Sequence, residues 1–98
     1  MSWYTNILKS LQEGKTVQFR PHGNSMTPKI KSGQLVTVIP VTLSDVQKGD
    51  VVLAKVKKHY YLHLVTAIKQ NQVQISNNHG HVNGWASKVF GKVIKVEK

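Results

Sequence analysis

The sequence predicts a small, mostly β protein: a coiled antiparallel β fold with one short helix at its N-terminus. Short segments rich in β-branched residues alternate between apolar and polar positions, and turn residues separate them at short intervals. Helical spacing of apolar residues occurs only near the N-terminus. At 98 residues, of which 40% are hydrophobic, the chain is long enough for one modest core. We therefore expect a single domain over residues 1–98.

The helix is expected over about residues 5–13. Thr5 or Ser2 is the expected N-cap, and Gly14 is expected to end the helix. We also expect Trp3 and Tyr4 to pack against the body of the domain; the alternative is a peptide or membrane contact through them. The apolar stripe that indicates this helix consists of Tyr4, Ile7, Leu8 and Leu11.

The β body is expected over about residues 16–96. Its strands are predicted at residues 17–19, 35–39, 51–56, 60–68, 72–76 and 89–96. Turns separate them, among them residues 31–33, 47–50, 57–59 and the pair Gln70–Asn71. Residues 77–84 are polar and contain Gly, so we expect a loop there.

The composition limits the partners and the chemistry. Lys and Arg total 14 against 4 Asp and Glu, a formal charge of +10, which favours an acidic partner: an acidic protein, nucleic acid or an anionic membrane surface. Arg20 is the only arginine, so specific nucleic-acid recognition is not expected. No apolar run approaches membrane-spanning length and no signal peptide is evident, so we expect a soluble, cytoplasmic protein without a membrane span.

Ser25 is the candidate nucleophile. Gly23 stands two residues before it and Pro28 three residues after it, and both favour a turn that exposes the Ser25 hydroxyl. The backbone N–H of Ser25 is then free to stabilise an oxyanion. Gly23, Asn24 and Met26 flank Ser25 and are the residues expected to contact the substrate or the oxyanion. The alternative interpretation is an ordinary surface turn.

His63 is the candidate general base. It lies inside the apolar strand of residues 60–68, on the face that alternation assigns to Tyr61 and Val65. The alternative is a half-buried histidine with a satisfied hydrogen bond. The sequence contains no Cys, and His79 and His81 lack a third ligand of suitable type, so we expect no metal and no cofactor. His22 is expected at the rim of a cleft and His59 in a turn.

Five ordered segments resemble those of the signal-peptidase/LexA-type serine peptidases. Residues 23–28 resemble the Gly-x-Ser-Met-x-Pro nucleophile box, and residues 62–65 fall where that family has its general base. The other three are residues 33–38, 48–52 and 90–94, which resemble the Gly-Asp-x-Val, Gly-Asp-Val-Val and Gly-Lys-Val elements. The order holds over roughly residues 14–96.

The resemblance implies a coiled β fold and peptide-bond hydrolysis by Ser25, with His63 as base, as in the His-containing branch of the family. Three positions depart from the family pattern: Gln34 replaces an Asp, Leu64 replaces an Arg, and the usual Asp is missing from residues 76–78. Asn77 or Asn78 is the candidate to orient His63 instead.

The sequence therefore predicts a standalone serine peptidase that cuts another protein. It has neither an anchor nor room for a DNA-binding domain, and it lacks the Ala-Gly or Cys-Gly bond that LexA-type proteins cleave in themselves. The alternative hypothesis is a catalytically inactive member of the same fold that binds a peptide segment or an acidic partner.

Overall fold

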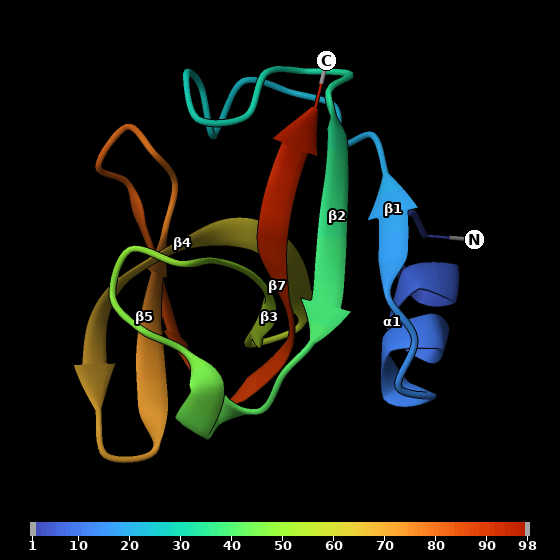
Figure 1. The fold of residues 1–98 in the computed structure, drawn as a ribbon. Helices are drawn as coiled ribbons and strands as arrows, with labels where there is room; N and C mark the ends of the chain where they lie inside the picture. Colours follow the sequence, from blue (N-terminus) through green and yellow to red (C-terminus); the bar gives the residue numbers. More distant parts are fainter. Residues whose placement is uncertain (1, 98) are drawn as a thin grey trace.

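The computed structural model describes residues 2–97 and contains one antiparallel sheet with a short helix packed beside it (Figure 1). The strand order in the sheet is β1-β2-β7-β3-β4-β5-β6. The elements are α1 (Thr5–Gln12), β1 (Val17–Phe19), β2 (Leu35–Pro40), the 3₁₀ helix η1 (Leu43–Asp45), β3 (Val51–Val56), β4 (His59–Lys69), β5 (Gln72–Ser76), β6 (Val82–Ala86) and β7 (Lys88–Glu97). The expected mostly β fold with one short helix is confirmed.

Helix α1 ends as the sequence predicts but begins differently. Gly14 has a positive φ of 82° and its N–H donates to the Leu11 carbonyl over 3.0 Å, which closes the helix. The N-cap is Tyr4, and no side chain caps the helix, so the predicted cap by Thr5 or Ser2 is wrong. The Tyr4 ring instead stacks on Tyr60 of β4, with 4.0 Å between ring centroids. This contact holds the start of the helix against the sheet.

The sheet curls so that β6, the last strand in its order, comes close to β3. A Cβ atom on Gly84 of β6 would lie 2.8 Å from Cγ1 of Val56 in β3. Register shifts interrupt the β4–β5 and β5–β6 ladders, and such bulges bend and twist the strands that carry them. Gly84 is needed here because no larger residue fits between the two strands.

Two hydrophobic cores fill the molecule. One lies inside the curled half of the sheet and includes Val52, Val65 and Ile75; the other lies between α1 and the sheet and includes Leu11, Val38 and Leu53. Residues Val52, Val65, Ile75, Val38 and Leu53 are fully buried. Strand β3 contributes side chains to both cores, so it joins the two halves.

The segment from residue 77 to residue 84 corrects the sequence prediction. It was expected to be a loop throughout, but strand β6 begins at Val82. Asn83 and Gly84 give this strand the composition of a loop, and β5 still supplies its backbone partners. His59 likewise begins β4, because Lys57 takes a φ of 56° and allows a two-residue turn before it.

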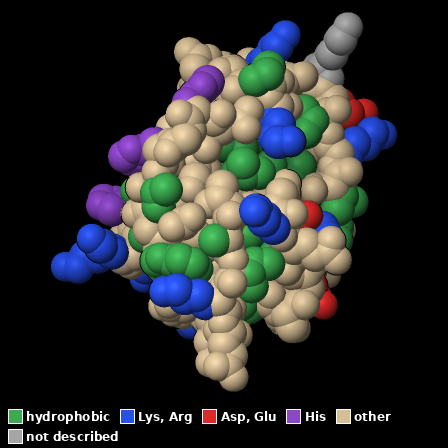
Figure 2. All heavy atoms as spheres, turned by 90° about the vertical axis from the view of Figure 1, so that its left-hand side faces the viewer, with side chains coloured by type: hydrophobic (Ala, Val, Ile, Leu, Met, Phe, Trp, Pro, Cys, Tyr) green, Lys and Arg blue, Asp and Glu red, His purple; other side chains and the backbone are tan. Residues whose placement is uncertain are grey.

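The surface carries most of the positive charge. Three of the four carboxylates form ion pairs, Glu13 with Lys15, Asp50 with Lys92 and Glu97 with Lys95. Figure 2 shows the basic side chains scattered among hydrophobic ones over the face that lies on the left of Figure 1. Within residues 2–97, no helix has the length and apolar character needed to cross a membrane.

Candidate active site

Ser25 lies on the long loop between β1 and β2, and its side chain is exposed. The loop is fixed at several points around it. The Ser25 carbonyl accepts a hydrogen bond from the Asn78 N–H over 2.8 Å. Met26 is 4% exposed and anchors the loop in the core beneath. Gly23 has a φ of 111°, a region that favours glycine, so the turn expected before Ser25 is present.

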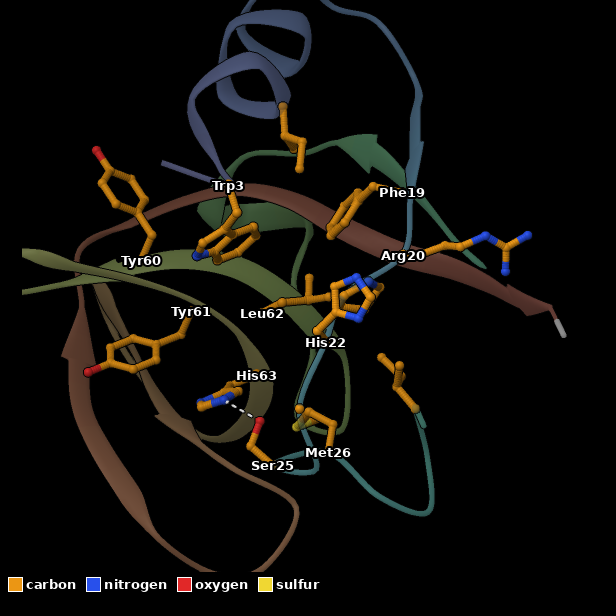
Figure 3. A pocket seen from close by; sticks show the side chains of 14 residues that line it. Trp3, Phe19, Arg20, His22, Ser25, Met26, Tyr60, Tyr61, Leu62 and His63 are labelled. Carbon is orange, nitrogen blue, oxygen red and sulfur yellow. Dashed lines mark hydrogen bonds between the residues drawn. The ribbon is translucent and has the colours of Figure 1, made fainter. Parts of the chain in front are cut away.

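His63 lies opposite Ser25, on strand β4. Its Nε2 atom is 3.1 Å from Ser25 Oγ, as the dashed line in Figure 3 shows. The Tyr61 ring stacks beside the imidazole, with 5.1 Å between ring centroids. The structure therefore brings together the two residues that the sequence named as nucleophile and base, although 38 positions separate them.

Asn83 holds the far side of the His63 ring. Its Oδ1 atom is 2.6 Å from His63 Nδ1. An amide oxygen only accepts hydrogen bonds, so Nδ1 carries the proton and the lone pair of Nε2 faces the Ser25 hydroxyl. Asn83 sits where β6 has one residue more than β5, since Ser76 pairs with Val82 and Ile75 with Gly84. This bulge directs the Asn83 side chain towards β4.

The two asparagines predicted to orient His63 have other partners. Asn77 Oδ1 accepts hydrogen bonds from the backbone N–H groups of His79 and His81 and so shapes the β5–β6 loop. Asn78 Nδ2 donates to the Thr27 carbonyl over 3.0 Å. Sequence reasoning thus had the right residue type at the wrong position. The signal for Asn83 was present in the strand-breaking dipeptide Asn83–Gly84, which indicates a bulge as readily as a loop.

The pKa of His63 is lowered from the usual histidine value. Burial is the largest cause, because it disfavours the charged ring. The hydrogen bond that His63 donates to Asn83 raises the pKa, and the electrostatic interaction with His81 lowers it further. His63 is therefore neutral at neutral pH, which is the state that accepts a proton.

The backbone beside Ser25 offers an oxyanion site. Among the hydrogen bonds of residues 2–97, none uses the Ser25 N–H, so this donor is available to a ligand. The Asn24 carbonyl, in contrast, accepts hydrogen bonds from the Thr27 hydroxyl over 2.9 Å and the His79 ring. Asn24 thus stiffens the loop, while Gly23 and Met26 line the adjoining pocket.

A pocket of about 400 Å³ opens next to Ser25 and His63 (Figure 3). Its walls come from the N-terminal segment, the loop after β1 and the first half of β4. His22 contributes to it, in keeping with its expected place at a cleft rim. Its fourteen lining residues are Trp3, Ile7, Phe19, Arg20, Pro21, His22, Gly23, Ser25, Met26, Ile30, Tyr60, Tyr61, Leu62 and His63.

His79 contacts the nucleophile loop from the β5–β6 loop. Its Nε2 atom is 2.9 Å from the Asn24 carbonyl oxygen and 3.0 Å from Thr27 Oγ1. From the sequence, His79 was expected only to lie in the loop of residues 77–84, and no metal was expected at His79 and His81. In the described part of the chain, no group of three or more His, Cys, Asp or Glu side chains is placed to hold a metal ion.

One comparison with known proteins identifies the family. A family model described as Peptidase S24-like matches residues 2–93, a range that includes Ser25, His63 and Asn83. No curated protein matches the chain. The family match covers nearly the whole sequence and agrees with the ordered motifs that resemble signal-peptidase/LexA-type proteins. The chain belongs to the Peptidase S24-like family.

Proposed function

We propose that this protein is a serine endopeptidase that hydrolyses a peptide bond in another protein. The observation that supports this proposal is the aligned series Ser25 Oγ, His63 Nε2, His63 Nδ1 and Asn83 Oδ1, with separations of 3.1 and 2.6 Å. A nucleophile, a base and an orienting group within hydrogen-bond reach of one another are the parts that acyl transfer needs.

The first half of the reaction forms an acyl-enzyme. Ser25 Oγ attacks the carbonyl carbon of the scissile bond while His63 Nε2 takes the hydroxyl proton. The Ser25 N–H stabilises the negative charge on the carbonyl oxygen. When the tetrahedral intermediate collapses, the C–N bond breaks and His63 returns its proton to the leaving amine.

The second half releases the acyl group. A water molecule attacks the ester carbon while His63 Nε2 takes one of its protons, and His63 then protonates Ser25 Oγ as the ester bond breaks. Asn83 holds the ring throughout. Its neutral oxygen stabilises the imidazolium less than a carboxylate does, so we expect a slower enzyme than one with a Ser-His-Asp triad.

A peptide-library cleavage assay with purified protein tests the proposal. We expect cleavage by the wild type and a loss of about 10³-fold or more in Ser25→Ala and in His63→Ala. His59→Ala, at the exposed start of β4 and outside the pocket, is the matched control and should retain full activity. Cleavage that survives in Ser25→Ala would contradict the proposal.

The second candidate is a catalytically inactive family member that binds a peptide segment or an acidic partner. The neutral amide of Asn83, in the position that orients His63, favours it. If this candidate holds, the wild type cleaves no peptide at any pH, and Ser25→Ala binds its partner as well as the wild type does.

A further inference from the structure

We infer that the segment bound beside Ser25 carries a large apolar side chain, which enters the pocket, and acidic residues near it in sequence. The inference rests on the proposed function only in taking this pocket as the place where the peptide substrate binds. It goes further by naming the substrate class, and it assigns Trp3 as a residue that determines specificity.

The volume and walls of the pocket favour a large apolar side chain. Its volume of about 400 Å³ lies in the range of roughly 300–1,000 Å³ that encloses small organic ligands. Phe19, Tyr60 and Leu62 form the side opposite Ser25, and Met26 forms the floor beside it (Figure 3). An aromatic or long aliphatic side chain covers these surfaces, whereas an alanine leaves most of them in water.

Trp3 stands at the outer edge of this wall. It is 51% exposed, and its ring packs edge-on against Tyr4 and lies 6.1 Å from the Phe19 centroid. Tyr4 is itself stacked on Tyr60, so a row of aromatic rings holds the indole at the mouth of the pocket. A large side chain that enters the pocket would bury the exposed part of Trp3, and this gain is absent for a small one.

The charges around the pocket favour acidic residues in the bound segment. None of the fourteen described residues that line it is Asp or Glu, whereas Arg20 lines it and its guanidinium donates to the Gly33 carbonyl over 2.8 Å at the rim. Lys55 adds a second cation, because its Nζ atom lies 5.4 Å from the centroid of the Tyr60 ring, which lines the pocket. These positive charges therefore attract carboxylates in the bound segment and repel lysines. Added salt weakens both interactions.

Binding to the inactive Ser25→Ala variant tests the inference without requiring catalysis. The probes are capped ten-residue peptides that share a Ser-Ala background, with Phe or Ala at the centre and Glu or Lys beside it. The protein contains two tryptophans, and Trp85 lies outside the pocket, stacked under Lys69. Adding Trp85→Phe makes the fluorescence of Trp3 a direct report of pocket occupancy, and calorimetry measures the affinity.

We expect the Phe peptide with Glu neighbours to bind about tenfold or more tightly than its Ala counterpart. It should also bind several-fold more tightly than the Phe peptide with Lys neighbours, and the second difference should shrink as salt is added. Trp3→Ala should reduce the preference for Phe over Ala. The matched control is Ile68→Ala, since Ile68 is equally exposed at 51% and lies outside the pocket, and it should leave the preference unchanged.

The outcomes separate this inference from the proposed function. Equal affinity for the Phe and Ala peptides, equal affinity for Glu and Lys neighbours at low salt, or no binding at millimolar peptide would overturn the inference. Selective binding by Ser25→Ala together with no cleavage by the wild type supports the inference and overturns the proposed function. Cleavage by the wild type without any preference among the four peptides supports the proposed function and overturns the inference.

Discussion

His63 is held by an amide oxygen rather than by a carboxylate, and this difference governs its acid–base behaviour. A carboxylate beside Nδ1 raises the pKa of a histidine and stabilises the imidazolium that forms when the ring takes a proton. Asn83 fixes the same tautomer and orientation without the negative charge. His63 is thus neutral, and able to accept a proton, over a wide pH range. The imidazolium that forms is stabilised less than it would be beside a carboxylate.

The lowered pKa of His63 predicts an unusual acid limb in the pH profile. In the proposed mechanism the neutral ring is the base, so kcat/KM should rise with pH through the pKa of His63 and be constant above it. Because burial lowers that pKa below 6.5, half-maximal activity should fall below pH 6.5, with full activity retained at neutral pH. A profile of kcat/KM against pH checks this, and half-maximal activity above pH 7 would contradict it.

Asn83→Asp should convert the site into a Ser-His-Asp arrangement. A carboxylate placed against Nδ1 should shift the acid limb to higher pH by about one unit and raise kcat at high pH by about tenfold or more. Asn83→Ala is the opposite test, since losing a hydrogen bond that raises the pKa should move the limb to lower pH while activity falls. Identical pH profiles for the wild type and both variants would show that Asn83 does not act on His63.

At the level of elements, the sequence predicted the parts of the site that lie in strongly patterned segments. Ser25 is marked by Gly23 and Pro28, and His63 by its apolar strand, so both were found. Asn83 was missed because β6 consists of Val, Asn, Gly, Trp and Ala, which lack strand alternation. The conformation of β6 depends on its pairing with β5 and on the close approach of Gly84 to Val56. Both are contacts between residues far apart in the sequence, so the local pattern of apolar residues does not predict them.

The β5–β6 loop supports the loop that carries Ser25, through the side chains of His79 and Asn78. We therefore expect His79→Ala to lower kcat by about tenfold with little change in KM, since losing such a hydrogen bond costs about 0.5–1.5 kcal/mol. His79→Gln keeps a donor that can reach the Asn24 carbonyl and should restore part of the rate. Steady-state kinetics at pH 8 measure both constants.

His81→Ala is the control for this experiment. His81 lies in the same loop, and its backbone N–H, rather than its ring, bonds to Asn77. Its charge affects only the pKa of His63, so kcat at pH 8 should equal that of the wild type. If His79→Ala raised KM and left kcat unchanged, the loop would serve to bind substrate and would not position Ser25.

The whole molecule places the site where its two cores adjoin. The base and its orienting residue belong to the curled half, whereas the pocket wall depends on the helix and the N-terminal segment before it. On the face shown in Figure 2, the Lys and Arg side chains are scattered and do not form one continuous patch. Docking of α1 on the sheet therefore connects the stability of the fold to the shape of the pocket.

Leu11→Ala tests this connection. Leu11 is 3% exposed and packs where α1 meets β7: a Cβ atom on Gly91 would lie 2.9 Å from Leu11 Cδ1. Truncating it should lower the free energy of unfolding by about 2–5 kcal/mol, measured by urea denaturation, because a cavity forms in the core. Gln12→Ala, at an exposed neighbouring position, is the control and should change stability by less than about 0.5 kcal/mol.

Since α1 also carries Ile7 to the pocket, Leu11→Ala should weaken binding of the Phe peptide while the Ser25–His63 pair stays intact. Weaker binding with unchanged stability would mean that the helix contributes to the pocket without holding the fold together.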